Sequence, residues 1–276
     1  MAVRKNIAGM ISAEVILSPS ILTEYTVLRD LVLSFWGHIL YIRNQIPLPV
    51  SNITGDVLEK YLSLEENKSR SKALQNRKLL NFNTKYKSLS VFLDMLFSTL
   101  SDQNKLHELK TVCVMMGPSA SSTLREAHFL HFDLLKSDEV PQKGPPENSQ
   151  NKREQSKRQL IRTLISNWNP ESDAFPIMNS FIGLQFEGAA SAYSEIQQSN
   201  ELLAANCDFT MKENFKIKLR KTSPPALEVR VCSSSSLDTT DIENFTGHDS
   251  DINKSGLGLN YWLVLRKGIE GVKSSS

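Results

Sequence analysis

The amino-acid sequence predicts an α+β fold in which helices pack on one face of a mostly antiparallel sheet. Two long helical segments precede the first group of predicted strands, and a third helical segment separates that group from the later strands. This order is typical of α+β proteins and not of alternating βαβ units. Residues 13–272 are expected to form one domain, with short tails at 1–12 and 273–276.

The first long helix is expected to begin near Ile21 and to run through the middle of the domain. Apolar residues recur at helical spacing from Leu28 to Ile42, and others fall around the rest of the circumference. A helix that is apolar on nearly all sides is buried on more than one side. Pro47 and Pro49 then end the helix, because proline cannot donate a backbone hydrogen bond.

The remaining elements follow from periodicity and from breaker residues. A second helix is predicted at Leu79–Leu100 and a third at about Gln155–Trp168, while the segments 136–154 and 233–256 are rich in turn-forming or charged residues and are expected to be flexible loops. The run Leu109–Met116 has the length and β-branched content of a strand buried on both faces. Further strands are predicted at Ala13–Leu17, Glu126–Leu135, Ile177–Phe186 and Leu257–Arg266.

Two late segments alternate apolar and polar residues, which predicts a hairpin with a basic outer face. Asn214–Arg220 places Lys216, Lys218 and Arg220 on one side, and Leu227–Val231 alternates in the same way after a proline turn. The basic face could bind phosphate, although a solvated strand face explains the same pattern.

Bulk composition excludes several classes of protein. The net charge of +2 is too small to argue for nucleic acid or an anionic membrane as a partner. The sequence contains neither a run of about 18 apolar residues nor the apolar core of a secretory signal. Cys113, Cys207 and Cys232 are odd in number and widely spaced, which indicates reduced thiols in an intracellular protein.

Motifs for catalysis or metal binding are weak. His128 and His131 have an H-x-x-H spacing, but in a strand these side chains point to opposite faces. Cys113 lies inside an apolar strand, where burial makes a thiol inert. Because no nucleophile elbow or complete phosphate loop occurs either, we expect no enzymatic activity, cofactor or metal.

The third predicted helix carries two adjacent apolar stripes, more than one contact with a sheet requires. One stripe can face the sheet, and the other would then lie at the surface with a basic rim, as in an interaction helix. A deeply seated core helix without an exposed stripe would have the same sequence pattern. The inner stripe is Leu160 and Leu164; the outer one is Ile161 and Ile165, could extend to Trp168, and is rimmed by Arg158 and Arg162.

Five segments keep a common order and spacing over most of residues 13–272. They are His38–Pro49, Val112–Gly117, Gln159–Ile165, Phe209–Phe215 and Asn260–Val264. Together they resemble the comet family, proteins that bind Mad-two and silence the spindle checkpoint. The resemblance implies a HORMA-like fold: a central antiparallel sheet backed by three helices, with C-terminal strands like a safety belt.

The resemblance also implies an adaptor without catalytic activity or cofactor. Such an adaptor binds the closed conformer of Mad-two and presents it to an AAA+ ATPase of the Pch-two type, which opens Mad-two and disassembles the mitotic checkpoint complex. It implies residence in nucleus and cytoplasm, and at the spindle or kinetochore in mitosis.

The resemblance assigns roles to individual residues. Ile161 occupies the position of the family's apolar contact to Mad-two, flanked by Arg162, and Arg158, Ile165 and Ile42 complete the expected Mad-two surface. Ile42 stands where the family usually has glutamine. Lys212 matches the position that presents the complex to the ATPase, and Met211 beside it replaces the usual proline.

A second hypothesis is a HORMA protein that traps a short peptide of a client under its own C-terminal belt. The two hypotheses differ in the strand at 257–265. If this strand is permanently docked and the chain fills its own groove, no client peptide can enter.

Overall fold

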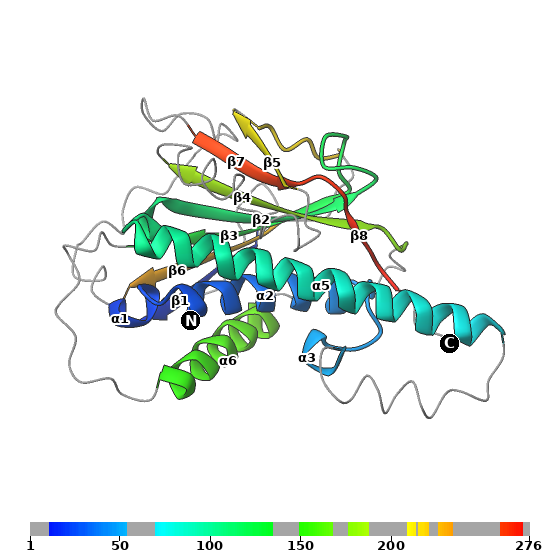
Figure 1. Ribbon diagram of the computed structural model, residues 1–276, viewed down its shortest axis with the longest axis horizontal. Helices are drawn as coiled ribbons and strands as arrows, with labels where there is room; N and C mark the ends of the chain where they lie inside the picture. Colours follow the sequence, from blue (N-terminus) through cyan, green and yellow to red (C-terminus); the bar gives the residue numbers. More distant parts are fainter. Residues whose placement is uncertain are drawn as a thin grey trace.

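All strands in the described residues belong to one eight-stranded mixed sheet, and three long helices lie on one side of it (Figure 1). The computed structural model describes residues 11–53, 70–134, 149–167, 176–187, 209–213, 215–220, 226–233 and 260–272. The predicted α+β class is therefore confirmed. No helix in these ranges is both long and apolar enough to cross a lipid bilayer.

The sheet is mostly antiparallel, as predicted. Its order is β1-β6-β3-β2-β4-β7-β5, and the short β8 also pairs with β4. The two pairings of β6, with β1 and with β3, are parallel, and the other strand pairings are antiparallel. The strands are β1 (Ile11–Leu17), β2 (Leu109–Gly117), β3 (Glu126–Phe132), β4 (Asn179–Glu187), β5 (Phe209–Glu213), β6 (Leu227–Ser233), β7 (Asn260–Leu265) and β8 (Ile269–Glu270).

The three long helices lie where they were predicted, but their ends differ, and the described residues contain two further short helices. The helix expected from Ile21 is divided by a turn at Thr23 and Glu24, so that α2 is preceded by a separate short helix. The third helix begins at Ser149, so residues 149–154 are helical and not part of a loop. The helices are α1 (Pro19–Leu22), α2 (Tyr25–Ile42), α3 (Val50–Ile53), α5 (Arg70–Asp102) and α6 (Ser149–Asn167), with a 3₁₀ turn at Leu106–Glu108.

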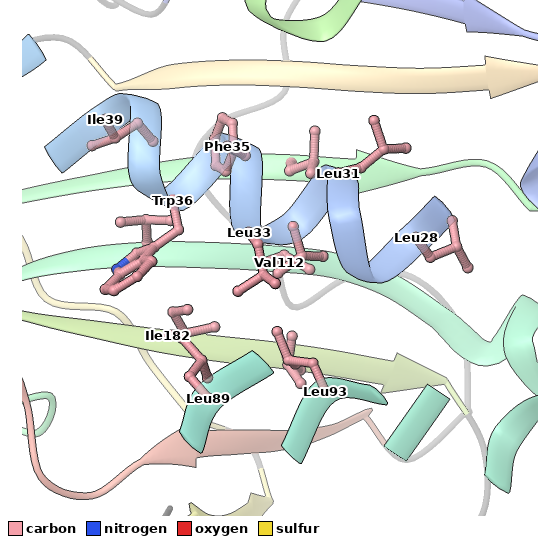
Figure 2. Close-up of a cluster of buried hydrophobic side chains, with 14 of the residues drawn as sticks. Leu28, Leu31, Leu33, Phe35, Trp36, Ile39, Leu89, Leu93, Val112 and Ile182 are labelled. Atoms are coloured by element: carbon pink, nitrogen blue, oxygen red, sulfur yellow. The ribbon is translucent and has the colours of Figure 1, made fainter. Parts of the chain in front are cut away.

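The main core lies between α2, α5 and the sheet, which confirms the central place predicted for the first helix. Figure 2 shows α2 side chains meeting Leu89 and Leu93 of α5 and residues of β2 and β4. Phe35 and Trp36 of α2 are fully buried. The Trp36 ring stacks on Phe82 of α5, with ring centroids 5.7 Å apart. Burial on two sides accounts for the apolar circumference of α2.

The predicted hairpin of 214–220 with 227–231 is wrong. β6 lies between β1 and β3, and the segment 215–220 instead crosses the sheet face opposite the helices. There the Leu124 amide donates to the Lys218 carbonyl at 2.7 Å. Phe215 and Ile217 pack on the second apolar cluster of the sheet, which also contains Trp262. The alternating pattern was real, but its apolar side covers a sheet face without forming a strand.

Candidate partner-binding surface

Helix α6 packs against α2 and the edge strand β1, which leaves its other flank open. Leu160 and Leu164 are fully buried, as predicted for the inner stripe. Ser156 and Thr163 are also buried on this side, and the Ser156 hydroxyl donates to the Lys152 carbonyl at 2.9 Å. Internal hydrogen bonding allows this polar side chain to sit against the core.

The open flank of α6 holds the four residues that the sequence predicted for it. Arg158, Ile161, Arg162 and Ile165 are spaced i, i+3, i+4 and i+7, which places them on one face of the helix. Ile165 is 60 % exposed, Ile161 is half-buried against the main core, and both arginines are exposed. Of the two residues predicted for the outer stripe, only Ile165 is therefore largely exposed, so the structure lies between the two alternatives. Trp168, which could have extended the stripe, lies outside the described residues.

A carboxylate on α2 holds the first half of α6 in place. Asp30 accepts hydrogen bonds from Arg153 of α6 at 2.8 Å and from its neighbour Arg29 at 2.9 Å. Lys157 lies 3.8 Å from the same carboxylate, and Arg29 also pairs with Asp94 of α5. Asp30 is mostly buried, so these pairs are less screened than surface pairs. This cluster connects all three long helices, and its α6 member Arg153 lies in the part of the helix that the sequence predicted as loop.

The edge strand β1 lies beside the open flank of α6. Its outer carbonyl at Ile16 accepts a hydrogen bond from the Gln159 side chain of α6 at 2.9 Å. The Ile16 side chain is 37 % exposed. The Gln159 side chain thus covers part of a sheet edge that would otherwise offer an unpaired backbone acceptor.

The helix-ending motif between His38 and Pro49 has a structural role that sequence reasoning missed. Arg43, just past the end of α2, forms a buried ion pair with Glu126 of β3. His128 Nε2 lies 2.8 Å from the same Glu126 oxygen, and His128 Nδ1 accepts from the Leu227 amide at 3.1 Å. Burial lowers the pKa of His128, and because Nδ1 accepts a hydrogen bond, the proton of a neutral ring is on Nε2, which faces the Glu126 carboxylate.

Gln45 in the same motif fastens three segments together. It is fully buried, and its Nε2 donates to the carbonyls of Arg43 and Pro176, each at 3.1 Å. Its Oε1 accepts from the Met178 amide at 2.8 Å. Gly271 lies so close that a Cβ there would be 2.7 Å from the Gln45 carbonyl oxygen. The motif therefore fixes the end of α2 against the start of β4 and the C-terminal segment.

Ile42, the first-helix residue predicted for partner binding, is the last residue of α2. It is half-buried and packs against the main core. The structure therefore gives Ile42 a packing contact with the main core, as it does Ile161 of α6, whereas Ile165 is largely exposed.

Lys212 and Met211 lie on β5, at the opposite edge of the sheet from α6 and β1. Met211 packs against the main core. Lys212 points to the other face, where its Nζ donates to the Ser121 hydroxyl at 2.8 Å and lies 4.9 Å from the Phe215 ring centroid. Six strand spacings of about 4.8 Å separate the two sheet edges by roughly 29 Å. The two predicted surfaces are therefore distinct.

The cysteine and histidines that the sequence offered as candidates for chemistry lie within strands of the sheet. Burial raises the pKa of the Cys113 thiol well above its usual value, as expected for an unreactive cysteine. His128 and His131 point to opposite faces of β3, and His131 Nδ1 lies 3.1 Å from the Thr111 hydroxyl. Within the described ranges, no group of three or more histidine, cysteine, aspartate or glutamate side chains is placed to hold a metal ion. The predicted loop residues 136–148 and 234–256 lie outside those ranges.

No protein-family model matches this sequence, and no curated protein is significantly similar to it.

Proposed function

We propose that this protein is a HORMA-like adaptor of the comet type, which binds closed Mad-two through α6 and presents it to a Pch-two-type AAA+ ATPase. The observation that carries the proposal is the open flank of α6. Ile165 is 60 % exposed beside two exposed arginines, on the helix whose sequence resembles the family's partner-binding helix. A small apolar centre with a charged rim suits a reversible protein interface.

The separation of the two candidate surfaces supports an adaptor role. A protein that binds Mad-two alone would stabilise whichever conformer it prefers. Opening the closed conformer against that preference requires energy from the ATPase, so the adaptor must contact both proteins at once. The α6 flank and Lys212 lie at opposite edges of the sheet, so the two predicted contact surfaces do not overlap.

The position of β7 favours the adaptor over the peptide-trapping alternative. β7 lies between β4 and β5 and is hydrogen-bonded to both. Trp262 and Leu263 of β7 are buried on opposite faces of the sheet. A belt that opens for a client peptide would have to break both ladders and expose both side chains.

Purified variants with matched charge changes test the proposal. Ile165→Asp is expected to abolish co-elution with closed Mad-two on gel filtration, and Ile161→Asp to do the same with some loss of stability, because Ile161 also packs on the core. Lys212→Glu is expected to leave Mad-two binding intact and to weaken recruitment of the ATPase. Lys216→Glu, on an exposed residue of the crossing segment, is the control. Wild-type binding by Ile165→Asp would refute the α6 interface.

A further inference from the structure

A second exposed stripe, on α5, combines apolar and basic residues. The first half of α5 extends beyond the sheet (Figure 1). Opposite its buried side, Leu80 is 48 % exposed and Val91 is 50 % exposed. Arg77, Thr84 and Lys87 are also exposed on this side. We call Arg77, Leu80, Thr84, Lys87 and Val91 the α5 stripe.

The spacing within the α5 stripe is that of a helix-pairing seam. Successive members are three, four, three and four residues apart, which is the heptad spacing of positions that face a partner helix. The Thr84 hydroxyl donates to the Leu80 carbonyl at 3.0 Å, so its polar group is already satisfied within the helix. The stripe is about 21 Å long at the helical rise, enough for one partner helix of about four turns.

The charge of α5 determines which partner fits. No aspartate or glutamate occurs from Arg70 to Leu93. Arg77 and Lys87 form no ion pair with any described residue, whereas Lys78 on the flank is paired with Glu270 at 3.0 Å. A second copy of this chain would oppose cations with cations in a parallel pairing, or cations with Leu80 and Val91 in an antiparallel one, and both disfavour self-association through the stripe. Carboxylates opposite Arg77 and Lys87 would be complementary.

We propose that the α5 stripe is a docking surface for an acidic amphipathic helix of a partner protein. Leucine-like residues of that helix would cover Leu80 and Val91, and its carboxylates would pair with Arg77 and Lys87. A single helix on this short stripe gives a small interface, so the contact is transient. The surface lies on a different helix from the α6 flank and does not depend on the function proposed above.

Synthetic helical peptides of roughly three heptads provide the probe. The acidic peptide places glutamate opposite Arg77 and Lys87 and leucine opposite Leu80 and Val91, in parallel and antiparallel versions. The basic peptide has lysine in place of each glutamate. Fluorescence anisotropy with the full chain is expected to show binding of one acidic version at least about tenfold tighter than its basic counterpart, with affinity falling as salt is raised.

Variants of the full chain make the test specific. Arg77→Glu/Lys87→Glu is expected to reverse the preference, while Leu80→Ser/Val91→Ser weakens both peptides. The control Lys216→Glu/Lys218→Glu makes the same charge change on exposed residues of the opposite sheet face, and should bind like wild type. Equal binding of acidic and basic peptides, or equal effects of the control and stripe variants, would overturn the proposal. Stripe-dependent binding to phosphatidylserine vesicles without peptide binding would also overturn it.

Discussion

Removal of Arg43 should destabilise the fold strongly, because it leaves a buried carboxylate without its cation. The Arg43 and Glu126 side chains are 8 % and 0 % exposed, and the pair fastens the end of α2 to β3. Removing one partner of a buried ion pair typically costs about 3 to 5 kcal/mol, because the other charge stays buried without a counter-charge. The intact pair itself contributes less than this to stability. Arg43→Met, which keeps the apolar stem, should therefore lose about 3 to 5 kcal/mol in free energy of unfolding.

A double variant separates the ion pair from simple packing. Arg43→Met/Glu126→Gln removes both charges but keeps an amide oxygen that can accept from His128 Nε2. Replacing both charges is usually far less costly than removing one, so the double variant should recover at least about half of the loss.

Urea denaturation followed by circular dichroism measures the free energy of unfolding of both variants and of wild type. A loss below about 1 kcal/mol for Arg43→Met would contradict the reasoning, since that value is typical of an exposed pair. Additive losses in the double variant would also contradict it, because residues in one buried network should be coupled.

Three further changes test other parts of the structure. Asp30→Asn should cost about 1 to 2 kcal/mol in free energy of unfolding and loosen α6, because it leaves Arg153 and its neighbours without their shared carboxylate. Faster amide hydrogen exchange in α6, with exchange in α5 unchanged, would show this. Gln45→Ala should cost about 2 to 4 kcal/mol, because two carbonyls and the Met178 amide lose their buried partner; unchanged urea stability would rule out the proposed hub. Burial, with help from Arg230, lowers the pKa of His131 to about 4. The unfolded chain therefore binds the extra proton first, and stability should fall by roughly 3 kcal/mol as pH drops from about 6.5 to 4. His131→Gln should remove this part of the pH dependence, and an NMR titration of the ring with a midpoint near 6.5 would refute it.

Local patterns in the sequence predicted the elements of the fold but not how distant segments meet. The apolar circumference of α2 and the continuous apolar run of β2 predict burial directly. An element that is apolar on all sides is stable only where other elements cover all of those sides. The alternation at 215–220 could not distinguish a strand from a crossing segment, because both can turn Phe215 and Ile217 toward apolar neighbours and the lysines between them toward solvent. The parallel partners of β6 are far away in sequence, so no turn between neighbouring strands specifies them.

Helix periodicity predicted which residues of α6 share a stripe, but not that Ile165 would be exposed, because a core helix has the same pattern. Leu160 and Ile165 differ little in chemistry, yet their places on the helix decide that one is buried and the other exposed. The buried cluster of Arg43, Glu126 and His128 was not predictable, because its members come from segments whose meeting depends on the whole fold. For the same reason, the contact of Lys212 with Ser121 follows only from the structure.

The measurement that tests the central claim most directly is the affinity of the wild-type chain for Mad-two locked in its closed form and locked in its open form. The adaptor account predicts co-elution and measurable affinity with the closed form, and at least about tenfold weaker binding to the open form, equivalent to about 1.4 kcal/mol of conformer discrimination. Equal affinity for the two forms, or binding to neither, would contradict the account.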